Sequence, residues 1–202
     1  MWAGLGILRF SLDLPKKVMQ KYFEKISNPL IFVLAAAFIR LIPHAPNFAP
    51  IGAMALFGGA YLNKKTAFLL PLAAMALSDF FIGFDSITSR LTVYGSFALI
   101  VLIGFWLRRE RSVGKVVLAS ITASVLFFII TNFGVWLAGS IYPKTLEGLV
   151  ACYSAAIPFF RNTMAGDLFY SGVFFGSFEL VKAWAGQKKL AFVKIGGKDV
   201  KN

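Results

Sequence analysis

Residues 113–141 read VGKVVLASITASVLFFIITNFGVWLAGSI, and after Lys115 this stretch holds no charged residue. A helix rises about 1.5 Å per residue, so roughly 20 apolar residues cross the hydrocarbon core of a membrane, which is about 30 Å thick. The stretch is therefore long enough and apolar enough to cross a bilayer as one helix.

Further apolar segments flank this stretch on both sides. The chain of 202 residues is 58% hydrophobic and 15% charged, with a mean hydropathy of +0.73, which is too apolar for an ordinary soluble domain. The class predicted is an all-α polytopic membrane protein with about six transmembrane helices in one domain, residues 19–186. The expected spans are 29–43, 50–62, 66–84, 88–107, 113–141 and 163–184.

The first two spans are short, and prolines and polar residues lie between them. Pro43, His44, Pro46, Asn47 and Pro50 predict a kinked or re-entrant connection there. Because lipid cannot satisfy N–H and C=O groups, non-helical backbone at this depth must be buried in protein or line a polar cavity. We therefore expect a cavity near this connection.

The basic residues give the orientation in the membrane. With six spans, 17 of the 21 Lys and Arg lie on one side, and the exceptions are Arg40, Arg90, Lys144 and Arg161. The positive-inside rule then predicts a multi-pass membrane protein with both termini in the cytoplasm. The net charge of +12 is explained by this topology, so no nucleic-acid partner is expected.

Three segments fall outside the predicted spans. Residues 1–18 either lie on the membrane surface or precede the true start at Met19. A cleavable signal peptide is rejected, because Arg40 and Pro43 follow the first apolar run in place of a cleavage site. Residues 145–160 are too polar to span and are expected to form an external helix or cap. Residues 187–202 form a basic cytoplasmic tail.

Polar groups inside the predicted spans are candidates for a site, because a membrane makes them costly. Counting about 1.5 Å per residue, Arg40, Asp79 and Asn132 lie roughly 20 to 25 Å from the cytoplasmic side, and Asp167 lies about 8 Å in from the outer end of its span. Polar groups inside an aromatic rim are typical of small-molecule pockets. The candidate substrate-binding residues are Arg40, His44, Asn47, Asp79, Asn132, Trp136, Phe160, Arg161, Asn162 and Asp167.

A second interpretation of these charges is purely structural. Arg40 and Arg161 would then neutralise Asp79 and Asp167 and hold helices together without a ligand. Near the inner face, Glu179 is expected to form a local pair with Lys182. Small residues four apart are expected to let helices pack within the bundle, namely Ala55 with Gly59, Ala119 with Ala123, Ser120 with Ser124, and Gly172 with Gly176.

Sequence motifs for enzymes and metal sites are missing. No nucleotide-binding, hydrolase or metalloprotease motif occurs, so neither an enzyme nor a bound cofactor is expected. His44 and Cys152, the single residues of their types, are far apart in sequence, and no chelating pattern predicts a metal.

Several runs carry a family resemblance. They are RLIPHAPNFAPIGAMALFGGAYL (40–62), PLAAMALSDFFIGF (71–84), NFGVWL (132–137) and YPKTLEGLVACYSAAIPFFRNTMAGDLFYS (142–171). They resemble a family of uncharacterised bacterial inner-membrane proteins, which in turn resembles the S components of energy-coupling factor vitamin transporters. This resemblance implies a six-helix bundle that binds a vitamin or precursor at the outer face. It also implies docking on a module with ATPases through an A-x-x-x-A motif, from which the consecutive Ala35, Ala36 and Ala37 depart.

The function expected from the sequence is capture of a small solute at the outer face for uptake. One alternative is a self-sufficient secondary carrier in which Asp79 or Asp167 relays a proton or ion. Another is a structural or assembly subunit of a membrane complex, in which the polar layer only holds helices together.

Overall fold

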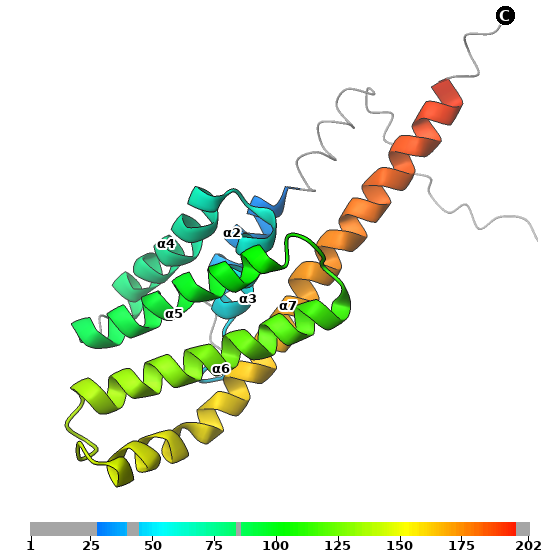
Figure 1. The fold of residues 1–202 in the computed structure, drawn as a ribbon. Coiled ribbons are helices and arrows are strands. Elements are labelled where there is room, and N and C mark those ends of the chain that lie inside the picture. The colour runs from blue at the N-terminus through cyan, green and yellow to red at the C-terminus, as the bar shows by residue number, and fades with distance from the viewer. Residues whose placement is uncertain (1–27, 40–44, 84–85, 197–202) are drawn as a thin grey trace, which may run out of the picture.

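The computed structural model describes residues 28–39, 45–83 and 86–196, and this part of the chain folds into six α-helices without a strand (Figure 1). The all-α prediction is confirmed. Residues 1–27, with the predicted N-terminal segment, lie outside the described part, as do Arg40 and His44. The helices are α2 Pro29–Ile39, α3 Ile51–Tyr61, α4 Lys64–Ile82, α5 Ile87–Trp106, α6 Val113–Ala138 and α7 Leu146–Gly196.

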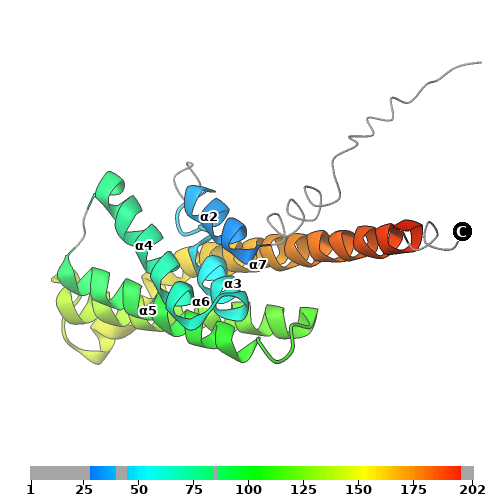
Figure 2. The ribbon, with the colours of Figure 1, turned by 90° about the horizontal axis from the view of Figure 1, so that it is seen from above.

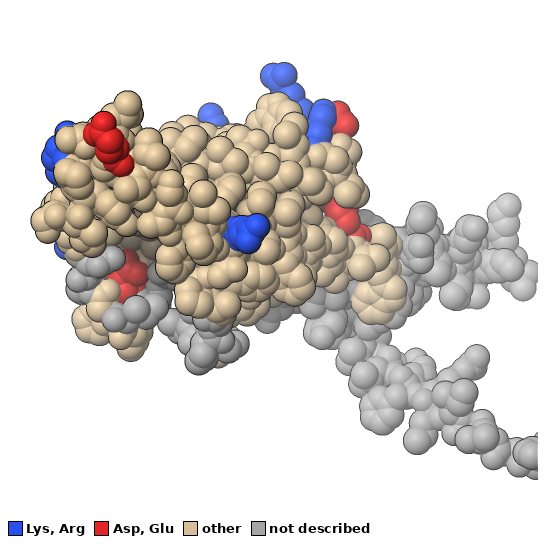
Figure 3. All heavy atoms as spheres, turned by 90° about the horizontal axis from the view of Figure 1, so that it is seen from below, with Lys and Arg blue, Asp and Glu red and all other residues tan. Residues whose placement is uncertain are grey.

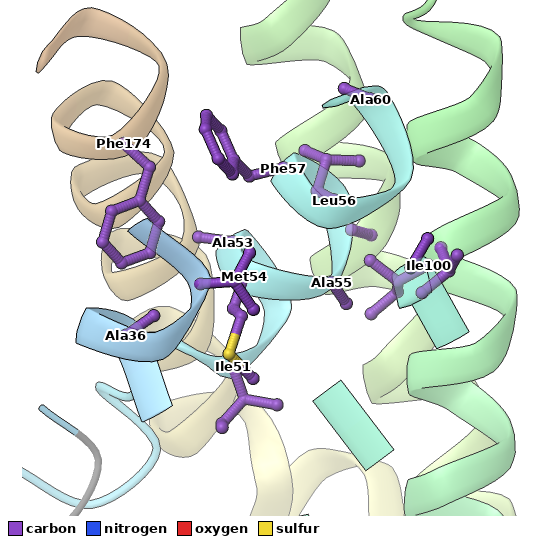
Figure 4. Packing of buried hydrophobic residues seen from close by; sticks show 14 of the residues in the cluster. Ala36, Ile51, Ala53, Met54, Ala55, Leu56, Phe57, Ala60, Ile100 and Phe174 are labelled. Atoms are coloured by element: carbon purple, nitrogen blue, oxygen red, sulfur yellow. The ribbon is translucent and has the colours of Figure 1, made fainter. Parts of the chain in front are cut away.

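Helix α3 is the centre of the bundle. Residues 51–60 are all buried, and α3 contacts each of the other five described helices. Figure 4 shows its side chains between Phe174 of α7 and Ile100 of α5. Glycine and alanine make up most of α3, so its neighbours can approach its backbone closely. A helix of 11 residues is about 16 Å long, which is too short to cross a membrane alone.

Helices α3 and α5 approach each other closely at two glycines. A Cβ atom added to Gly59 would lie 2.4 Å from the carbonyl oxygen of Val101 and 2.8 Å from Cα of Gly104. A Cβ added to Gly104 would lie 2.4 Å from the carbonyl oxygen of Leu56. Only glycine fits at this crossing, which confirms that Gly59 serves packing within the bundle.

Short polar signals set where the neighbouring helices begin and end. The side chain of Asn63 accepts a hydrogen bond from the backbone N–H of Thr66 at 2.9 Å and caps α4. Ser86 caps α5 in the same way through the N–H of Ser89, at 3.2 Å. Gly83 ends α4 with a φ of 111°, a conformation that glycine adopts without strain.

Helix α7 differs from the prediction. Residues 146–160 are helical as predicted, but their separation from a span that starts at residue 163 was wrong, because Leu146–Gly196 form one helix. Pro158 lies inside α7, and the ribbon bends between its yellow and orange parts without a break (Figure 1). Two polar residues of this stretch bond to α6: the thiol of Cys152 donates to the carbonyl of Asn132 at 3.5 Å, and the hydroxyl of Tyr153 donates to the carbonyl of Ile129 at 2.6 Å. The last turns of α7, residues assigned in the prediction to a tail, are helical and extend beyond the other helices (Figure 2).

The outer surface of the bundle is apolar. Every described helix except α3 exposes large hydrophobic side chains, among them Phe38, Phe80, Leu91, Val113 and Leu180. Figure 3 shows a face on which uncharged residues predominate and most charged residues lie toward the ends.

The expected packing of Gly172 with Gly176 is also wrong. Both are exposed, and an added Cβ would meet no described atom within 4 Å, although this pair has the same four-residue spacing as the buried pairs.

Candidate functional site

The N-terminal end of α3 is capped by a carboxylate from another helix. Asp167 of α7 is only 4% exposed, and the backbone N–H of Ala53 donates a hydrogen bond to it. Ala53 is the third residue of α3, so its N–H has no partner within its own helix. Pro50, at the N-cap position, makes no side-chain hydrogen bond to the helix. Asp167 therefore does for α3 what an N-cap side chain does in other helices.

Ser124 of α6 completes the surroundings of this carboxylate. Its hydroxyl donates to Oδ2 of Asp167 at 2.7 Å, and both side chains are buried. The same residue was expected only to pack helices through its spacing from Ser120. Both serines are buried as expected, and Ser124 in addition ties α6 to α7.

Gly52 is the point at which α3 touches this carboxylate. A Cβ added there would lie 2.2 Å from Oδ1 of Asp167 and 2.9 Å from its Cγ. The carboxylate therefore occupies the space that any other residue would need at position 52. One residue before Asp167, Gly166 lets the backbone of Phe48 approach, since a Cβ on Gly166 would lie 3.2 Å from Cα of Phe48.

Within the part of the chain that the structure describes, no lysine or arginine pairs with Asp167. The proposed lock between Arg161 and Asp167 is not present there, because Arg161 is exposed. The carboxylate instead lies at the positive end of the α3 dipole and accepts a hydrogen bond from the Ser124 hydroxyl. Elsewhere, Lys115 pairs with Glu110, and Lys182 pairs with Glu179.

A cavity of about 160 Å³ opens beside this carboxylate. Polar groups from three residues lie along it: Asn47 in the segment before α3, and Thr163 and Asp167 of α7. The remaining lining is apolar or backbone and comes from the segment before α3, from the start of α3 and from α4, α5 and α6: Ala49, Ile51, Gly52, Met75, Val93, Phe97, Ile100 and Phe127. The cavity thus has a polar region and a larger apolar region.

Two of the predicted site residues, Asn47 and Asp167, line this cavity, and a third supports it. Asn47 has a φ of 62°, in the left-handed region that asparagine tolerates better than most residues. The side-chain amide of Asn162 donates to the carbonyl of Pro46 at 3.0 Å and so holds the segment that carries Asn47 against α7. The prediction of a cavity beside the proline-rich connection agrees with this geometry.

The other described candidates do not line the cavity. Asp79 accepts a hydrogen bond from the hydroxyl of Tyr94 at 2.5 Å. The Asn132 amide donates to the carbonyl of Phe128 in its own helix at 2.8 Å. The ring of Phe160 packs on the ring of Phe128, with centroids 4.7 Å apart.

Trp136 belongs to the end of α6, where its indole N–H donates to the carbonyl of Pro143 at 3.0 Å. Lys144 donates to the carbonyls of Trp136 and Gly139 in the same turn. Neither predicted aromatic residue therefore lines the cavity: Trp136 lies at the connection of α6 to α7, and Phe160 packs on α6.

The C-terminal end of α3 is held by two arginines that follow α5. Arg108 donates to the carbonyls of Gly59 at 2.8 Å and Leu62 at 2.5 Å, and Arg111 donates to the carbonyl of Ala60 at 2.9 Å. These carbonyls belong to the end of a helix, where a positive charge is favourable. The central helix is thus capped by a carboxylate at one end and by guanidinium groups at the other.

Next to these arginines, α3 is tied to α7. The guanidinium of Arg111 lies 4.4 Å from the ring centroid of Tyr61, and the hydroxyl of Tyr61 donates to Oε1 of Glu179 at 2.7 Å. Glu179 also pairs with Lys182 at 3.6 Å, so the predicted local pair is confirmed.

In the α5–α6 connection, the hydrogen bond from Lys115 holds the pKa of Glu110 below its ordinary value.

Sequence reasoning found the carboxylate of the site but missed most of its surroundings. Gly52 and Ser124 were available as signals, because a glycine at the start of a short helix and a serine in an apolar span each invite an explanation. The apolar wall from α4, α5 and α6 had no signal, since its residues look like any others in a membrane span.

The helices and their outer surface define the class of protein. It is an all-helical protein in which two helices, Ile87–Trp106 and Val113–Ala138, are long and apolar enough to cross a membrane, which indicates association with a membrane. A family model described as a family of unknown function, DUF6580, matches residues 20–190, and the chain belongs to this family. No curated protein and no solved structure gives a significant match.

Proposed function

We propose that this chain is a multi-pass membrane protein that binds a small solute in the cavity at the N-terminal end of α3 and takes part in its uptake. The observation that carries the proposal is the cavity itself: about 160 Å³ of space in the bundle, with the buried carboxylate of Asp167 on its wall. A few polar groups set in an apolar enclosure are the usual composition of a small-molecule site.

The surface of the helices supports a location in the membrane. Only 28% of the most apolar stretch of α5 is buried inside the protein, and the value for α6 is the same. The core helix of a soluble protein would be mostly buried, whereas these helices turn apolar side chains outward. Helix α3 does not cross by itself, but its ends are satisfied by protein groups, as lipid requires.

The charge pattern supports six crossings with the cavity toward the outside. The positive-inside rule places Arg108 and Arg111, and with them the C-terminal end of α3, at the cytoplasmic side. The cavity lies at the opposite end of α3, beside Gly52 and Asp167. In this orientation a solute would reach it from the outer face.

One observation favours a second candidate, a structural subunit in which Asp167 only fastens helices. Its contacts with Ala53 and Ser124 would serve that purpose without any ligand. The cavity distinguishes the two functions, because a helix cap needs no space beside it.

The test is native mass spectrometry of the protein released from its own membrane, comparing the parent with two variants. Val93→Phe places a larger side chain in the cavity, and Val117→Phe makes the same change on α6 at a side chain that is 42% exposed. We expect a small bound molecule on the parent and on Val117→Phe, and none on Val93→Phe. Absence of such a molecule from the parent, or its retention by a folded Val93→Phe protein, would contradict the proposal.

A further inference from the structure

We infer that the cavity takes a small organic cation, with a protonated amine or similar cationic nitrogen beside Asp167 and a compact apolar body against the opposite wall. This inference rests on the proposed function and adds the chemical class of the solute. Three features of the cavity carry it: the acceptor capacity of the carboxylate, the occupation of the α3 N-terminus, and the shape of the apolar wall.

The carboxylate of Asp167 keeps free capacity to accept hydrogen bonds. An ionised carboxylate has about four acceptor positions. Ser124 fills one on Oδ2 and the N–H of Ala53 fills another, and no lysine or arginine of the described residues pairs with the group. Because Asp167 also lines the cavity, the unfilled positions are available to a ligand that donates hydrogen bonds.

The same arrangement works against an anionic solute. A free helix N-terminus attracts anions, but here Asp167 already occupies the start of α3 and brings its own negative charge. Among the residues that the structure describes, no lysine or arginine lines the cavity to offset that charge. An anion would therefore meet a like charge in a poorly screened setting, whereas a cation would meet its complement.

The apolar wall determines the size and the apolar character of the body that the ligand can have. Phe97 of α5 and Phe127 of α6 both line the cavity, with ring centroids 5.2 Å apart, and Val93 and Ile100 lie beside them. An apolar cavity of about 150 Å³ holds benzene in another protein, so 160 Å³ suits a body of about that size. Aromatic faces also attract a neighbouring cation.

The experiment uses three probes of nearly equal shape: benzylamine, benzyl alcohol and benzoate. Their binding to the full chain in lipid nanodiscs is measured by calorimetry, and the Val93→Phe protein provides the blank for partition into lipid. We expect benzylamine to bind about tenfold or more tightly than benzyl alcohol, and benzoate to bind least. Asp167→Asn should abolish the preference for the amine while benzyl alcohol still binds.

The outcomes separate this inference from the proposed function. If benzyl alcohol or benzoate binds the parent as tightly as benzylamine, the cavity is a binding site but the cationic class is wrong. If no probe binds the parent above the blank, both the inference and the proposed use of the cavity fail. The ranking in the parent decides the matter even where Asp167→Asn does not fold.

Discussion

Gly52→Ala is the change that acts most directly on the contact between α3 and Asp167. The new methyl carbon would lie 2.2 Å from Oδ1 of Asp167, about 1 Å closer than the two atoms can approach. The carboxylate cannot retreat without lengthening its hydrogen bonds to Ser124 and Ala53. The substitution should therefore displace Asp167, move the start of α3, or both.

The magnitude follows from three terms. Overpacking of a buried site costs about 1 to 3 kcal/mol of unfolding free energy. Loss of a helix cap costs about 1 kcal/mol more. Alanine is the better helix former and returns up to about 1 kcal/mol. We expect Gly52→Ala to lower the unfolding free energy by about 1 to 3 kcal/mol and to abolish binding of the solute.

Gly58→Ala is the matched control, because it makes the same substitution in the same helix. An added Cβ at Gly58 meets its nearest neighbour, Cδ1 of Leu62, at 3.7 Å, an ordinary contact. Both variants are unfolded by heat and by denaturing detergent in the same micelles as the parent. Gly58→Ala should match the parent within about 1 kcal/mol. Equal stability and equal solute binding in both variants would refute the packing described for Gly52.

Three further changes test the rest of the bundle. Gly104→Ala should destabilise the protein by about 1 to 3 kcal/mol in the same melting assay, because its methyl group would meet the backbone of α3. Gly95→Ala is the control and should not destabilise the protein, because its added Cβ would have no described atom within 4 Å. Equal melting temperatures for the two variants would count against the α3–α5 crossing. Arg108→Gln should lower the unfolding free energy by about 2 kcal/mol, because its hydrogen bonds to α3 are lost. Arg109→Gln, at an exposed position, should leave the unfolding free energy nearly unchanged. Equal unfolding free energies for the two variants would show that the C-terminal cap contributes no stability. A reporter fused after Lys189 should be active in its cytoplasmic form, and activity only in a periplasmic form would exclude six crossings with both ends inside.

The sequence predicted helices well where apolar length and end signals agreed. Asn63 and Ser86 are the N-cap residues of α4 and α5. Both helices begin within two residues of the starts expected from the sequence. The predicted interruption between residues 145–160 and the last span failed, because polar residues do not by themselves end a helix and Pro158 lies inside α7 without ending it. It also failed for Gly172 and Gly176, because spacing alone does not say which face of a helix has a neighbour.

The site was predicted in part for a similar reason. Asp167 could be found because a carboxylate in an apolar span is rare, and Asn47 because polar residues lie between two short spans. Which of the polar residues meet depends on helix rotation, which the sequence does not fix. Asn132, for example, turns its amide to its own backbone, so its presence in an apolar span did not indicate a place in the cavity.

Labelling at Thr163 tests whether the solute cavity opens to the outer face of the membrane. Thr163→Cys is made in a Cys152→Ala protein, and intact cells are treated with a permanently cationic thiol reagent that cannot cross the membrane. Thr163 lines the cavity, so we predict labelling from outside. The exposed Ser112→Cys, near the arginine end of α3, should be labelled only after the cells are permeabilised. Labelling of Thr163→Cys only after permeabilisation, or of Ser112→Cys in intact cells, would contradict the account.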